Sequence, residues 1–210
     1  ITMYSAIQDE VVEKELWEEG KRSESRLRHD VNNFKILLHF LGRPRRHLAA
    51  PKKAAAWSKK TIKIVEGLSN DGKVPAAWLG YYWYAHLLAA CRLFGCGEDK
   101  KEEGYAYLEK AFELYPAWKN IPDGELLDVG DEMIYGGIKL IKGKEIIELP
   151  DGTREGINYG DMFYHKAEHM YYGMTAKRGW EWFNSVREEE RFKKYIERAK
   201  ILMENEKHNK

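Results

Sequence analysis

The chain has 210 residues, 43% of them hydrophobic, a formal net charge of +1 at pH 7 and a mean hydropathy of −0.65. This length suits one large domain or a short array of helices, and the hydrophobic content excludes a disordered chain. No run approaches the roughly 18 apolar residues of a membrane helix and no apolar leader is found, so we expect a cytoplasmic protein without a membrane span.

The charge is unevenly distributed along the chain. Residues 21–63 hold thirteen Lys and Arg against two acids, whereas residues 102–132 hold nine acids against two Lys. We expect the basic 21–63 region to face the acidic half of the same chain; contact with nucleic acid or an acidic partner is the alternative. The stretch GRPRRHLAAPKK has no aromatic residue for base stacking, which weakens the nucleic-acid alternative.

Apolar residues at helical spacing predict five helices before residue 120. They cover about 3–19, 27–41, 57–68, 76–94 and 102–116. The fourth is apolar nearly all round, which is typical of a helix at the centre of a bundle or stack. We therefore expect this helix to organise the fold.

The fifth predicted helix and its predecessor resemble a tetratricopeptide repeat. The small, large, small and proline positions of the second repeat helix are matched by Gly104, Leu108, Ala111 and Pro116, and Leu88–Ala89 serves as the large-small pair of the first helix. An unrelated antiparallel helical hairpin is the alternative. The resemblance implies paired antiparallel helices that pack closely through small residues.

The segment 138–159 changes to the alternating pattern of a strand, and Lys142–Gly143 and Asp151–Gly152 mark two tight turns. We expect a small β-meander here, followed by a helix over 160–174 and a closing helical segment. In that segment Arg191–Phe192, Tyr195–Ile196 and Arg198 resemble the last helix of bacterial tetratricopeptide proteins.

Taken together, residues 76–205 resemble the C-terminal helical part of bacterial XRE-type helix-turn-helix regulators. The resemblance implies a sensor or interaction module. The DNA-binding domain usual for that family is not recognisable in this chain, and because the first residue is Ile rather than Met we expect the chain to begin inside a longer protein.

The predicted fold class is all-α, with tetratricopeptide-like antiparallel helix pairs in a stack and a small β-meander insertion near 138–159. We expect one helical-repeat-like domain over 1–210. Its parts are basic N-terminal helices (1–70), a repeat-like helical hairpin (71–137), the β insertion (138–159) and C-terminal helices (160–210).

A ligand-binding groove is implied by the repeat resemblance. Four residues fall at first-helix positions that line the concave face of a tetratricopeptide array: Trp83, His86, Ala90 and Leu93. With nearby Arg92 they are the candidate contacts for a peptide or a small ligand. Core packing is the competing use of such an aromatic stripe.

Two histidine motifs suggest chemistry. The stretch SRLRHDVNNF resembles the phosphoacceptor box of a class of sensor histidine kinases, which makes His29 an alternative phosphotransfer site, with Asp30 orienting the imidazole. The stretch HKAEH fits the H-x-x-E-H arrangement of inverzincin metallopeptidases, with His165 and His169 as zinc ligands and Glu168 as base. Because nucleotide-binding boxes and a supported third zinc ligand are missing, we expect ordinary histidines at these positions.

No G-x-S-x-G elbow, phosphate-binding loop or dinucleotide turn occurs, and the spacing of Cys91 and Cys96 fits neither a zinc knuckle nor a redox pair. We therefore expect a non-enzymatic protein-interaction or ligand-sensing module without a cofactor, serving as the regulatory part of a bacterial transcription regulator. The expected partners are a protein or peptide, or a small-molecule effector. Nucleic acid is expected only through an attached domain or weakly through residues 21–63, and a homodimer is one option.

Overall fold

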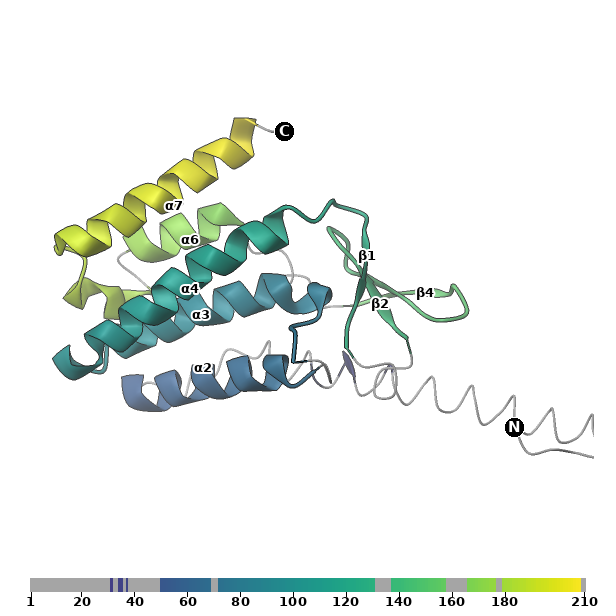
Figure 1. Cartoon of the computed structure of the whole chain (residues 1–210), viewed down its shortest axis with the longest axis horizontal. Coiled ribbons are helices and arrows are strands. Elements are labelled where there is room, and N and C mark those ends of the chain that lie inside the picture. The colour runs from purple at the N-terminus through teal and green to yellow at the C-terminus, as the bar shows by residue number, and fades with distance from the viewer. Residues whose placement is uncertain are drawn as a thin grey trace, which may run out of the picture.

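A computed structural model of the chain describes residues 31, 34, 35, 37, 50–68, 72–130, 137–157, 166–176 and 179–208. This part is mostly helical with a small antiparallel sheet (Figure 1). Its α-helices are α2 (Pro51–Glu66), α3 (Leu79–Phe94), α4 (Lys101–Lys119), α6 (Ala167–Thr175) and α7 (Glu190–His208). Short 3-10 turns are η1 (Ala76–Trp78), η2 (Glu98–Lys100) and η4 (Glu181–Ser185), and the strands are β1 (Leu126–Asp128), β2 (Lys139–Ile141), β3 (Ile146–Glu148) and β4 (Arg154–Gly156).

The helices lie side by side in the order α2, α3, α4, α7, with α6 beside α7 and the sheet at one end (Figure 1). Helix α3 is the central one, because α2 covers one of its sides and α4 and η4 cover others. Its residues are almost all buried, as its apolar sequence predicts. The predicted helix at 3–19 lies outside the described residues, and the helix predicted at 57–68 begins earlier, at Pro51.

Helices α3 and α4 form a closely packed antiparallel hairpin. A Cβ atom on Gly104, near the start of α4, would lie 2.7 Å from the ring of Phe94 at the end of α3. At the other end of the hairpin, a Cβ on Gly80 would lie 2.9 Å from the ring of Trp118. The two backbones therefore approach closely at both ends. Helix α4 continues past Pro116 to Lys119, so it does not end where the repeat pattern placed its boundary.

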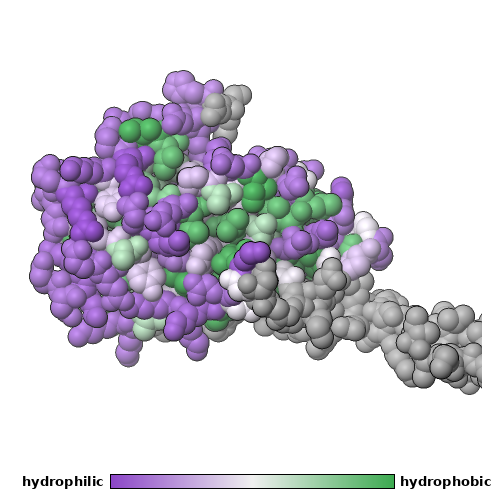
Figure 2. Space-filling view, in the orientation of Figure 1, coloured by the Kyte–Doolittle hydropathy of each residue, from purple (hydrophilic) through white to green (hydrophobic). Residues whose placement is uncertain are grey.

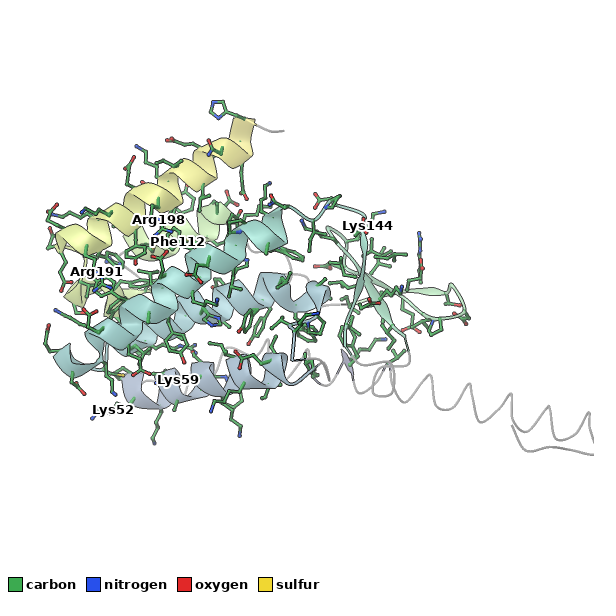
Figure 3. The ribbon with its side chains drawn as sticks, in the orientation of Figure 1. Lys52, Lys59, Phe112, Lys144, Arg191 and Arg198 are labelled. Carbon is green, nitrogen blue, oxygen red and sulfur yellow. The ribbon has the colours of Figure 1, made fainter. Side chains whose placement is uncertain are left out.

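Charged and aromatic side chains join α7 to α4. The guanidinium groups of Arg191 and Arg198 lie 3.8 Å and 4.6 Å from the ring centres of Tyr105 and Phe112, and Figure 3 shows both arginines reaching towards α4. Arg198 also donates two hydrogen bonds, of 2.9 and 3.1 Å, to the carboxylate of Glu109. This bidentate pair holds the pKa of the Glu109 carboxyl below its usual value.

The sheet is a four-stranded antiparallel meander in the order β1-β2-β3-β4. Leu127 pairs with Leu140, and Leu140 pairs with Ile147, so one buried residue of each of three strands lines the inner face. The predicted β insertion at 138–159 therefore lacked a strand: β1 comes from the segment 71–137 that was assigned to the helical hairpin. A run of three residues is too short to show strand periodicity. The mostly helical fold with a small β-meander is confirmed, and the correction is that the sheet also takes a strand from outside the predicted insertion.

Lys142 fastens the sheet to the helices. Its ammonium group donates a hydrogen bond of 2.9 Å to the carbonyl oxygen of Trp118, in the last turn of α4. It donates a second one to the carbonyl oxygen of Ile121, just after the helix. The carbonyl of Trp118 lies at the negative end of the helix dipole, so a cation there is stabilising. Burial lowers the pKa of the Lys142 amine. Among the helices that the structure describes, none is long and apolar enough to cross a membrane.

Candidate functional site

The structure corrects the expectation of an open groove along α3. Trp83 and Ala90 are fully buried, and Leu93 and His86 are 2% and 5% exposed. These side chains belong to the core rather than to a concave surface. The aromatic ring of Trp83, for example, meets that of Tyr115 of α4 edge-on at 5.1 Å.

Helix α4 covers Trp83, whereas α2 packs on another side of α3, where it meets Arg92. Arg92 is half-buried and donates hydrogen bonds to the carbonyl oxygen of Ala54, at 3.4 Å, and to the hydroxyl of Ser58. Its guanidinium is therefore occupied by α2 and tethers the two helices. Burial lowers the pKa of this guanidinium.

A polar and aromatic cluster lies where α2, α3 and α4 meet, and it holds the part of the predicted site nearest the surface. Six residues form this cluster, which we call the α2–α4 seam: Lys59 and Glu66 of α2, Tyr82 and His86 of α3, and Glu103 and Tyr107 of α4. Glu66 is exposed, three members are half-buried, and Tyr82 and His86 form the buried floor. The seam thus combines an accessible polar rim with a desolvated aromatic floor.

His86 is held in one orientation on this floor. Its Nδ1 donates to the carbonyl oxygen of Tyr82 at 2.9 Å, and its ring meets those of Tyr82 and Tyr107 at 4.5 and 5.5 Å between centres. The hydroxyl of Tyr82 in turn donates to Glu66 at 2.6 Å. Because burial disfavours the charged imidazolium, the pKa of His86 is below its ordinary value.

The rim of the seam is made by an ion pair and a neighbouring ring. Lys59 forms a salt bridge with Glu103, which holds the pKa of the Glu103 carboxyl below its usual value. The ammonium of Lys59 also lies 5.9 Å from the centre of the Tyr107 ring. This ion pair is the contact by which the described part of the basic 21–63 region meets the acidic 102–132 region. Half-buried groups of this kind can exchange their partner for a ligand at modest cost.

The low pKa of His86 makes stability depend on pH. In the unfolded chain this imidazole binds a proton near pH 6.5, whereas in the folded protein it binds one only at lower pH. Burial is the main cause of the lowered pKa. The positive charge of Lys110 also lowers it, and the negative charge of Glu66 only partly offsets this. The free energy of unfolding is therefore expected to fall as the pH drops below about 6.5. Urea titrations between about pH 7.5 and 5 check this, and His86→Gln is expected to show a shallower fall. An identical pH profile for the variant would show that His86 does not contribute.

The other predicted chemical sites are not assembled in the described residues. His29 and His165 lie outside them. His169 is described and exposed, and its Nδ1 accepts a hydrogen bond from the backbone N–H of Lys166 at 2.9 Å. Helix α6 begins only at Ala167 and Lys166 is extended, so the motif does not run through one continuous helix. No cluster of three His, Cys, Asp or Glu suited to a metal occurs in the described ranges.

Both cysteines are free thiols. Cys91 is buried, and burial raises the pKa of its thiol to about 12, so the reactive thiolate is suppressed at neutral pH. Cys96 is partly exposed and donates to the carbonyl oxygen of Arg92 at 3.2 Å. Burial raises the pKa of this thiol as well.

Comparison with known proteins gives no information about the seam. No family model, curated protein or solved structure matches the chain.

Sequence reasoning missed most of the seam. Of its members, only His86 was a predicted contact. The other seam residues are mostly on helices different from that of His86: Glu66 is on α2, and Glu103 and Tyr107 are on α4. Nothing in the local sequence pattern links them to His86. A weak signal was present in the opposite charges of the 21–63 and 102–132 regions, which meet at Lys59 and Glu103.

Proposed function

We propose that this protein is a non-enzymatic interaction or ligand-sensing module, and that it binds a peptide at the α2–α4 seam. The observation that carries the proposal is the seam itself, where three helices bring a rim with both charges beside an aromatic floor. Recognition sites for peptides combine a few orienting polar groups with aromatic contact surface in this way.

Each rim residue has a distinct part in this proposal. The ammonium of Lys59 would bind a peptide carboxylate or carbonyl, and Glu66 would bind a peptide N–H or basic side chain. The exposed part of the Tyr107 ring would pack against an apolar side chain. Such a ligand would displace the Lys59–Glu103 ion pair, a half-buried contact that costs little to break.

The regulatory role is part of the same proposal. We place the chain as the sensor part of a bacterial transcription regulator with tetratricopeptide-like helix pairs. The support is the XRE-like pattern over residues 76–205 together with the tight α3–α4 hairpin. A peptide wedged between α2 and α4 would favour one packing of the helices over another and so pass a change to an attached domain or a dimer partner.

A random peptide library displayed on phage tests the binding site. We expect the wild-type chain to enrich a family of related peptides, and Lys59→Gln/Tyr107→Ala to lose at least tenfold of that enrichment because it removes a charge and a ring from the rim. The matched control is Lys194→Gln/Tyr172→Ala, which removes an exposed lysine of α7 and an exposed tyrosine of α6, away from the seam. Equal enrichment by the seam variant, or none by the wild type, would contradict the proposal.

A further inference from the structure

The outer face of α2 is a concentrated patch of positive charge. Lys52, Lys53, Lys60 and Lys63 are all exposed and fall within about 100° of arc around the helix. The first and last are about 16 Å apart along its axis. The exposed residue between them is Ala56, whose small side chain leaves room for close approach to a surface.

No Asp or Glu side chain in the described part of the chain neutralises the lysines on the outer face of α2. None of the four lysines forms an ion pair with another residue in the described ranges, whereas Lys59, on the flank towards α4, pairs with Glu103. The acids of α4 are engaged elsewhere: Glu102 pairs with Arg191 and Glu109 with Arg198, both of α7, and Glu113 pairs with Lys110 of α4 itself. Figure 3 shows Lys52 at the N-terminal end of α2, and in Figure 2 the surface over α2 is mostly hydrophilic.

The chemistry of the face selects among polyanions. A protein partner would need apolar anchors at the centre of its interface, and the outer face of α2 exposes only lysines and Ala56. Single-stranded nucleic acid would need aromatic rings for base stacking, and a membrane surface would need apolar side chains to insert. The phosphate backbone of a duplex needs only cations spaced along a convex surface, which α2 supplies.

We infer that the outer face of α2 binds the phosphate backbone of double-stranded nucleic acid without reading its sequence. The four lysines form ion pairs with phosphates and release the counterions condensed on the duplex. This contact adjoins the seam at Lys59 but uses other side chains of α2 and does not depend on the proposed peptide site. In a transcription regulator it would let the sensor part itself touch DNA, with an affinity set by salt.

Fluorescence anisotropy of the full 210-residue chain with a labelled random-sequence DNA duplex of about 30 base pairs tests the inference. At monovalent salt between about 25 and 150 mM, we expect the logarithm of the binding constant to fall linearly with the logarithm of the salt concentration. Lys52→Gln/Lys60→Gln is expected to weaken binding at least tenfold at about 50 mM salt and to reduce the slope by about 1.8, since each phosphate contact contributes about 0.9.

The matched control is Lys194→Gln/Lys207→Gln, which removes two exposed lysines of α7 and should leave affinity and slope near the wild-type values. Because the substituted side chains are all exposed, both variants should keep the wild-type thermal midpoint. The basic residues before α2 are present in every variant, so the difference isolates α2. Three results would overturn the inference: no duplex binding at low salt, equal losses in the two variants, or tighter binding of poly-glutamate, a single strand or phosphatidylserine vesicles than of the duplex.

Discussion

Replacing Trp83 with alanine is expected to lower the free energy of unfolding by about 3–5 kcal/mol. The indole is completely buried between α3 and α4, with the ring of Tyr115 at 5.1 Å and that of Tyr84 at 5.7 Å. Its removal leaves a cavity that the neighbouring rings cannot fill without moving the helices. Urea unfolding followed by circular dichroism measures the loss.

Trp83→Phe is the control for this prediction. It keeps an aromatic ring in the core and should lose no more than about half as much stability as the alanine variant. Both variants, measured where they remain folded, should bind a selected peptide with near wild-type affinity, since Trp83 is fully buried and is not a seam residue. A Trp83→Ala protein of normal stability that fails to bind would restore Trp83 as a ligand contact.

Gly104→Val is expected to destabilise the protein by about 3 kcal/mol because it overpacks the α3–α4 crossing. A Cβ there already lies 2.7 Å from the Phe94 ring, and valine adds two methyl groups. Phe94 has no room to retreat, since it is buried against the rings of Tyr105, Phe183 and Phe192, with centres 5.0 to 6.1 Å away. Thermal and urea unfolding both measure the effect.

The control for Gly104→Val is Ala106→Val, two residues further along α4 and exposed. It introduces the same β-branched side chain into the same helix and should cost only the difference in helix propensity, about 0.5 kcal/mol. If the two substitutions cost the same, the close approach of α3 and α4 at Gly104 would not contribute to stability. That outcome would also remove one support for tetratricopeptide-like pairing.

The helices were largely predictable from local pattern. The apolar stripe of α3 shows its central position, and Gly104 with Ala111 marks a helix that approaches a neighbour closely. Strand β1 was not predictable, because Leu126–Asp128 is too short to show alternation and becomes a strand only through its pairing with β2. The extension of α4 past Pro116 was also not predicted. The proline removes one backbone hydrogen bond from the helix, but the last turn buries Trp118, and this burial outweighs the loss.

The candidate site was harder to predict than the fold. The repeat alignment placed Trp83, Ala90 and Leu93 on an open surface, but all three are buried, and Trp83 packs against Tyr115 of α4. The accessible part of the site is therefore the seam, at Lys59 and Tyr107. The lysines of α2 were visible as a basic run, but only the helix geometry shows that four of them share one outer face.

Hydrogen–deuterium exchange of the full chain, with and without a peptide selected by the wild type, shows whether a peptide binds across the α2–α4 seam. We predict slower exchange in the second half of α2 and the first half of α4, around Lys59 and Tyr107, with little change in α7 or the sheet. Protection confined to α6 and α7 or to the sheet, with the seam unchanged, would contradict binding at the seam.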